Sequence, residues 1–260
     1  MLAELMIPIM NLALVAGVGV ILPSALQARR LWPWWFAAFG VVVSLLLPAG
    51  PLAALFVVPW LALTIITGVL ALARREWWRS LVAGFAGTAS LALISSRLEL
   101  TAFGIVEPIV KLTALHFTYA GAGTLALALR LHHARPSRWT SLARVLVLLA
   151  PPLVASGFVL RSALGQVGGA TLMTCGVWLV ALLQWPDARS GPGRWWWRVS
   201  CLSPWVAMVL GVSWAASQYW PSVPALIVPD MVPTHGALNA FGFVLCAHLG
   251  WRRESHAPPG

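Results

Sequence analysis

Long apolar runs constrain this chain more than any other feature of its sequence. Stretches of about 18 or more apolar residues recur along its 260 residues, of which 60% are hydrophobic and only 9% charged. An α-helix needs a run of about that length to cross a hydrocarbon core about 30 Å thick. Because hydrocarbon offers backbone groups no hydrogen bonds, repeated runs predict an all-α, polytopic membrane helix bundle.

Charged residues, prolines and glycines divide the sequence into about nine predicted transmembrane helices. They lie near residues 5–27, 33–49, 52–73, 80–96, 107–130, 144–160, 166–185, 199–218 and 233–250. The first run has no basic segment before it and no small-residue cleavage site after it. We therefore expect a retained first helix instead of a signal peptide.

The formal net charge of +10 raises the question of a nucleic-acid partner. The arginines form no basic stripe interleaved with stacking aromatics, so none is expected. They gather instead in every second connection, at 29–30, 74–79, 130–138, 188–198 and 251–253. This alternation follows the positive-inside rule and predicts a multi-pass protein of a bacterial-type cytoplasmic membrane, with its N-terminus outside and its C-terminus in the cytoplasm.

An internal repeat is visible in the polar residues. "EWWRS" at 76–80 aligns with "WWWRV" at 195–199 at an offset of 119 residues, and His116 and His235 keep that offset (235 − 116 = 119). We therefore expect two parallel four-helix repeats, residues 31–138 and 139–253, within a single membrane domain of residues 1–260. Residues 1–30 would form an extra helix and residues 254–260 a short cytoplasmic tail.

The segment "EPIVKLTALHFTYAG" at 107–121 places four ionisable groups in one apolar stretch. Lys111, the only lysine, is expected to face a cavity or a partner, because a charge near the bilayer centre costs about 2.5 to 3.5 kcal/mol. Glu107, four residues earlier, could pair with it and cap a helix that begins at Pro108. His116 and Tyr119, three apart, are expected to share a face. The alternative is a capped helix end with a snorkelling lysine.

A second polar group follows the proline-rich segment 219–233. Four prolines predict an irregular segment and then a helix that begins near Pro233. His235 and Asn239 would share one face of that helix, and Asp230 would lie just before it. Capping would equally explain Asp230, and either histidine could be a hydrogen-bonded core residue. Seven residues are expected to converge in one outer pocket: Glu107, Lys111, His116, Tyr119, Asp230, His235 and Asn239.

"LTALHFTYAG" at 112–121 and "MVPTHGALNAFGF" at 231–243 resemble two motifs of the YndJ-like family of bacterial integral membrane proteins. The family pattern implies a second histidine at position 118, where this chain has Thr118. The compact size and the composition rich in Arg, Ala and Trp also look like the small membrane-bound terpene cyclases of bacterial indole-sesquiterpenoid pathways. That likeness implies cyclisation of a linear isoprenoid or a prenylated aromatic.

Cyclisation by protonation needs an acid shielded from water, aromatic faces for cations and a terminal base. Glu107 or Asp230 would be the acid, and His116 or His235 would orient it or act as the base. Since Lys111 favours the ionised form of Glu107, both carboxyls remain candidates. Tyr119 would help to position the substrate, and the expected substrate-binding residues are Lys111, Asn239, Trp214 and Phe117.

No cofactor and no metal are expected for that reaction, and the partners would be an isoprenoid that enters from the bilayer and the lipids themselves. The oligomeric state stays open. Two other functions fit the same residues. A transporter would use the parallel repeats, the broken helix and the charged pocket. A haem protein would use His116 and His235 as paired axial ligands.

Overall fold

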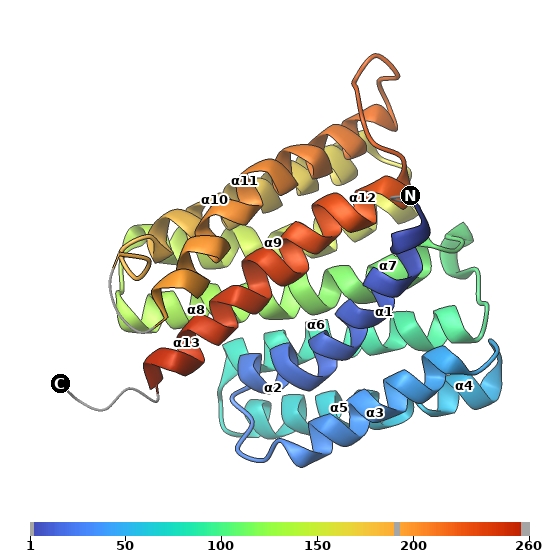
Figure 1. The fold of residues 1–260 in the computed structure, drawn as a ribbon, viewed down its shortest axis with the longest axis horizontal. Helices are drawn as coiled ribbons and strands as arrows, with labels where there is room; N and C mark the ends of the chain where they lie inside the picture. The colour runs from blue at the N-terminus through green and yellow to red at the C-terminus, as the bar shows by residue number, and fades with distance from the viewer. Residues whose placement is uncertain (1–2, 190–192, 256–260) are drawn as a thin grey trace. The chain divides into compact units, whose positions relative to one another are not determined.

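The computed structural model describes residues 3–189 and 193–255, and all regular structure in that part of the chain is helical (Figure 1). Within these residues, six helices are long and apolar enough to cross a membrane: Ala3–Ala25, Pro51–Ala73, Ile109–Ala134, Arg138–Val159, Leu164–Gln184 and Arg194–Ser217. A shorter apolar helix spans Trp32–Leu46. The predicted all-α membrane architecture is confirmed.

The other helical segments, Trp77–Arg97 and residues 228–255, coincide with the fourth and ninth predicted spans but are not among those six. The count of about nine transmembrane helices therefore stays a prediction. Three predicted segments lie partly outside the described residues: the extra helix by residues 1 and 2, the second repeat by residues 190–192, and the cytoplasmic tail by residues 256–260.

The chain forms two compact units, one of residues Met10–Ala126 and one of Met1–Ile9 with Leu127–Gly260. The first unit holds most of α1 (Met6–Ala16), then η2 (Gly17–Ile21), α2 (Leu22–Ala25), α3 (Trp32–Leu46), α4 (Pro51–Leu55), α5 (Val58–Ala73), α6 (Trp77–Arg97), η3 (Ala102–Gly104), α7 (Ile109–His116) and η4 (Phe117–Gly123). The segments η2 and η4 are π-helices.

Small residues let the helices of the first unit approach closely. α3 packs on α5, α5 on α6, and α6 on both α7 and η4, while η2 also contacts η4. A Cβ atom added to Gly17 of η2 would lie only 2.7 Å from Thr118 Cγ2 of η4. Glycine at such points brings two backbones together, which is a common device of helix contacts in membranes.

The second unit contains η1 (Ala3–Leu5), most of α8 (Thr124–Ala134), α9 (Arg138–Val159), η5 (Leu164–Gly168), α10 (Gly169–Gln184), α11 (Arg194–Ser217), α12 (Val228–Met231), η6 (Val232–Gly236), η7 (Leu238–Leu245) and α13 (Cys246–Ser255). α9 packs on α10, α10 on α11, and α11 on η6, η7 and α13. The segments η5, η6 and η7 are π-helices.

The last helical segment begins earlier than the sequence indicated. The irregular stretch covers residues 218–227, and α12 starts at Val228 instead of near Pro233. Pro229 lies in the first helical turn, where its missing N–H costs nothing because that donor has no partner inside the helix. Pro233 falls in the wider π-helical turn η6, so the proline pattern placed the start of the helix too late.

In the described part of the chain, four helices are followed, two positions after their last residue, by a non-glycine residue with positive φ. Gln27, Arg75, Glu99 and Arg161 have φ between 49° and 61°. Each ending is closed by a six-residue hydrogen bond, as between Glu76 N and Ala71 O at 2.8 Å and between Leu100 N and Ser95 O at 3.0 Å. This is the Schellman geometry, in which glycine is the usual residue, so a polar side chain here costs backbone strain.

The tight contact between α9 and α10 gives a stability prediction. A Cβ added to Gly169 would lie 2.7 Å from Val154 Cγ2 and 2.8 Å from Val154 N. We expect Gly169→Ala to destabilise the protein by about 1 to 3 kcal/mol, because the added methyl overpacks a contact with backbone. The check is thermal unfolding in detergent, followed by tryptophan fluorescence.

Gly84→Ala is the matched control. Gly84 also lies inside a helix, but nothing is within 4 Å of a Cβ added there. This substitution should leave the melting temperature unchanged or raise it, because Ala is the better helix former. Equal destabilisation by both substitutions would contradict the packing argument.

Candidate functional site

Lys111 has its polar partner on another helix. Its Nζ donates a hydrogen bond to Asn11 Oδ1 of α1 at 2.6 Å, and the side chain is half-buried. Glu107 is exposed and precedes the helix, because α7 starts at Ile109 and Pro108 is the N-cap residue. Among the described residues Glu107 forms no ion pair with Lys111. The predicted Glu107 cap and Glu107–Lys111 pair are therefore wrong, since helical spacing does not apply to a residue outside the helix.

His116 and Tyr119 occupy different environments. Tyr119 is 5% exposed, and its hydroxyl donates to Ala13 O of α1 at 2.8 Å. His116 is exposed, and its Nδ1 lies 2.7 Å from Leu112 O in its own helix. The expectation of a shared face fails because π-helical geometry begins at Phe117. Hydrogen bonding from i to i+5 reduces the rotation per residue, so residues three apart separate further around the axis.

The residues beside Tyr119 are part of the core of the first unit. Thr118 is fully buried, and its hydroxyl donates to Ala114 O at 2.8 Å. It lies against Gly17, at the closest approach of η2 and η4. The ring of Phe117 is 8% exposed and contacts Phe85, with ring centroids 5.8 Å apart. A threonine at position 118 suits this close contact, whereas an imidazole would push η2 away.

In the second unit, His235 is anchored to a neighbouring helix. Its Nδ1 lies 2.6 Å from Ala207 O of α11, a distance at which the ring N–H donates to the carbonyl. In a neutral ring this leaves Nε2 as the basic nitrogen. A Cβ at Gly211 would lie 2.7 Å from His235 Cε1, so glycine makes the space for the ring.

Asn239 and Asp230 belong to the same helical segment as His235. Asn239 Nδ2 donates to His235 O at 3.1 Å and lies 3.3 Å from His235 Nδ1. Asn239 Oδ1 is buried and has no hydrogen-bond partner among the described residues. Asp230 is half-buried, and its carbonyl accepts from Thr234 Oγ1 at 2.6 Å. Because η6 is π-helical, Asp230 and His235 are five residues and about one turn apart.

Aromatic side chains stack in pairs at α11, the helix that packs against this segment. Trp214 stacks on Phe158 with ring centroids 6.1 Å apart, and Trp178 stacks on Trp205 at 5.0 Å. Trp178 Nε1 donates to Pro204 O at 3.2 Å, so this ring is held in place. The described residues contain no group of three or more His, Cys, Asp or Glu that could hold a metal ion.

Comparison with known proteins supports the family resemblance that the motifs at 112–121 and 231–243 indicated. The family model of YndJ-like proteins matches residues 2–243. The chain belongs to the YndJ-like family. Within this family it is similar to an uncharacterized membrane protein, YndJ of Bacillus subtilis (strain 168), at 28% identity over 171 residues. The match covers 63% of this chain and 30% of that protein. No solved structure matches the chain.

The family match establishes a membrane protein with several apolar helices. It extends over almost the whole chain, whereas the sequence motifs covered two segments. Four of the seven polar residues that were expected to converge lie in the first unit of this YndJ-like protein and three in the second, so their convergence stays a prediction. The terpene cyclase likeness likewise remains a prediction.

Three groups that accept hydrogen bonds from the predicted site residues were not indicated by the sequence. Asn11 was not among the seven residues expected in the pocket, and its bond to Lys111 spans 100 residues. The carbonyls of Ala13 and Ala207 carry no side-chain signal at all. Gly17 and Gly211, which make room for the partner residues, are the sequence features that could have indicated these contacts.

The Lys111–Asn11 bond gives a second prediction. Lys111→Met and Asn11→Leu should each destabilise the protein, and the double variant should recover about 1 to 3 kcal/mol relative to the sum. The recovery arises because each single variant leaves a polar partner unsatisfied. Thermal unfolding of the four proteins in detergent measures this coupling free energy.

Lys111→Met with Tyr119→Phe is the control pair. Both side chains contact α1, but they bond to different acceptors, Asn11 Oδ1 and Ala13 O. The effects of these two substitutions should add. Additive behaviour of the Lys111–Asn11 pair would mean that their hydrogen bond contributes nothing to stability.

Proposed function

We propose that this protein is an intramembrane terpene cyclase that protonates a linear isoprenoid or prenylated aromatic. The observation that carries the proposal is the anchoring of His235 on Ala207 O, which orients its basic nitrogen in a segment that also holds a half-buried carboxyl, Asp230. A fixed imidazole and a nearby carboxyl are the two groups that transfer protons in such a reaction.

The proton balance assigns one step to each group. The Asp230 carboxyl gives its proton to a double bond of the substrate, so that a C–H bond forms and a carbocation is left. Ring closure moves the cation along the chain, and His235 Nε2 removes a proton from a neighbouring carbon to form the final double bond. The product is an isomer of the substrate, and the proton returns from His235 to Asp230 through solvent. No cofactor is required.

Asp230 is favoured over Glu107 as the acid. Glu107 is exposed and lies before α7, whereas Asp230 is half-buried and belongs to the helical segment of His235. The Asp230 carboxyl is thus the one that shares a helical segment with the anchored imidazole. The roles expected for Glu107, His116, Tyr119, Lys111 and Phe117, which all lie in the first unit, stay predictions.

Asn239 and Trp214 would hold the substrate. The buried Asn239 Oδ1 lacks a donor in the described part of the chain, and a substrate hydroxyl or N–H would satisfy it. Trp214, half-buried and stacked on Phe158, offers the type of ring that stabilises cations best. Both residues share a unit with Asp230 and His235.

Transport is the second candidate function. It is favoured by the similar order in which the helices pack in the two units. In the first unit α3 packs on α5, α5 on α6, and α6 on α7 and η4. The second unit repeats this order, because α9 packs on α10, α10 on α11, and α11 on η6 and η7. In both units a π-helix contains or directly follows the motif histidine. This supports two parallel four-helix repeats, an arrangement found in some transporters.

The cyclase proposal predicts a deuterium-labelled product. We expect purified protein in D₂O to convert a member of a panel of linear prenylated aromatics and polyprenyl compounds into an isomer that carries one deuterium. Asp230→Asn should slow this conversion at least about 100-fold, because general acid catalysis contributes about 10² to 10⁴. Mass spectrometry of the products measures both results.

Glu107→Gln and Glu99→Gln are the matched controls, since both remove an exposed carboxyl. They should keep most of the activity, and an equal loss in Glu107→Gln would make Glu107 the acid. No conversion across the panel, together with substrate uptake by proteoliposomes, would replace cyclisation with transport. An absorption spectrum of the same sample tests the haem alternative.

We also propose that the N-terminus lies outside and the C-terminus in the cytoplasm, and that about nine helices cross the membrane. A green fluorescent protein fused to the C-terminus should then fluoresce, which reports a cytoplasmic location. Alkaline phosphatase fused after Glu99 should be active, which reports a location outside. The reason is the clustering of arginines at alternate helix ends. Active alkaline phosphatase at the C-terminus would contradict this orientation.

A further inference from the structure

The first unit contains a cavity of about 170 Å³ where α2 and α5 end and α6 begins. A cavity of about 150 Å³ is large enough to admit benzene, so this one has room for a small chemical group. Its apolar lining includes Leu26, Trp34, Leu70 and Ala71. Its charged lining consists of Arg29, Arg74, Arg79 and Glu76, with a formal charge of +2 (3 − 1 = 2).

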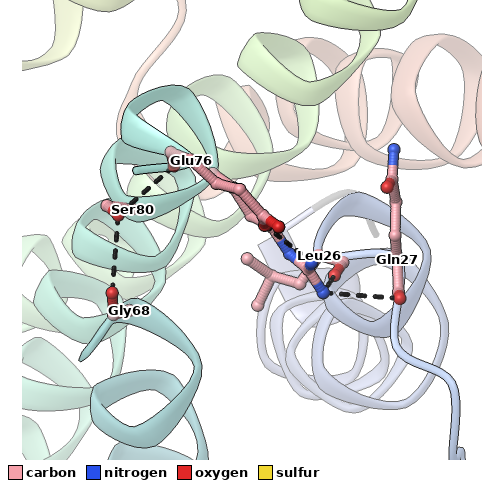
Figure 2. Close-up of polar contacts among 6 residues, drawn as sticks. Leu26, Gln27, Gly68, Glu76 and Ser80 are labelled. Carbon is pink, nitrogen blue, oxygen red and sulfur yellow. Dashed lines mark hydrogen bonds and ion pairs between the residues drawn. The ribbon is translucent and has the colours of Figure 1, made fainter. Parts of the chain in front are cut away.

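One ion pair fixes the wall of this cavity. Arg79 Nη1 donates to Glu76 Oε2 at 3.0 Å, and Nη2 donates to Leu26 O at 2.5 Å. Figure 2 shows these contacts, together with the bonds of Ser80 to Glu76 and Gly68. Arg79 therefore joins the start of α6 to the end of α2, and the Glu76 carboxylate is already paired.

No carboxylate among the described residues pairs with the positively charged side chains of Arg29 and Arg74. Both are exposed, and among the described residues neither side chain has a hydrogen bond or an ion pair. Because the carboxylate in the lining is bound to Arg79, only an anion from outside the chain would offset the charge of these two guanidinium groups. Guanidinium groups match phosphate oxygens in two-point hydrogen bonds.

The position of the cavity indicates where the anion comes from. It lies at the ends of two candidate membrane spans, Ala3–Ala25 and Pro51–Ala73. Trp35 and Trp77 next to it in sequence are 58% and 62% exposed, as expected for side chains at the level of lipid headgroups. We propose that Arg29 and Arg74 bind the phosphate of an anionic lipid headgroup in this cavity. The proposal is independent of the cyclase, since no candidate catalytic residue is involved.

The test compares two double variants of the full chain. Arg29→Gln/Arg74→Gln removes the two cations of the cavity, and Arg30→Gln/Arg75→Gln removes the adjacent arginines, which do not line it. Both change the net charge equally. Phosphatidylglycerol and phosphatidylcholine are each titrated onto protein in neutral detergent, and bound lipid is counted by native mass spectrometry.

We expect wild type to prefer phosphatidylglycerol and Arg29→Gln/Arg74→Gln to lose on the order of fivefold in affinity for each arginine removed, with Arg30→Gln/Arg75→Gln close to wild type. Equal losses in the two double variants, or no preference for the anionic lipid, would overturn the proposal. Displacement of the lipid by millimolar inorganic phosphate would overturn the lipid source and assign the site to soluble phosphate. Melting temperatures without lipid check that all variants fold.

Discussion

Hydrogen bonding of backbone carbonyls is the constraint on which the tertiary structure of this protein depends. Side-chain donors reach carbonyls outside their own helix in both units: Tyr119 to Ala13, Arg97 to Leu47, Arg198 to Ala188, and His235 to Ala207. A carbonyl has two lone pairs, so one inside a helix can accept a second bond, and one at a helix end is left without an intrahelical partner. In hydrocarbon this is the available way to pair polar groups without water.

The same contacts explain which features could be predicted from the sequence. Helical segments lie at all the predicted positions, because apolar length and charged breaks act locally. The pairing of Lys111 with Asn11 and of His235 with Ala207 O depends on which helices become neighbours, and nothing in the local sequence encodes that. Glu107 and Tyr119 were misplaced because the start of α7 and the π-helix η4 change the rotation that ideal α-helical spacing assumes.

The Nδ1 atoms of the two motif histidines lie against carbonyls of different helices. His116 bonds to Leu112 of its own helix, whereas His235 bonds to α11. A ring bonded to a second helix, as that of His235 is, keeps its position relative to the surrounding unit. The bond to Ala207 O holds the His235 imidazole in a defined position, which suits a group that must meet a reacting atom in a defined geometry.

The polar residues that end α5 and α6 also bear on the lipid environment. These consecutive helices pack against each other and run in opposite directions, and the positive-φ residues Arg75 and Glu99 follow their last turns. α6 has 21 residues, which at about 1.5 Å per residue corresponds to about 32 Å. In the proposed nine-helix topology, the charged ends thus set a hydrophobic length close to that of an average bilayer, and a much thicker membrane would have to thin locally around this pair of helices.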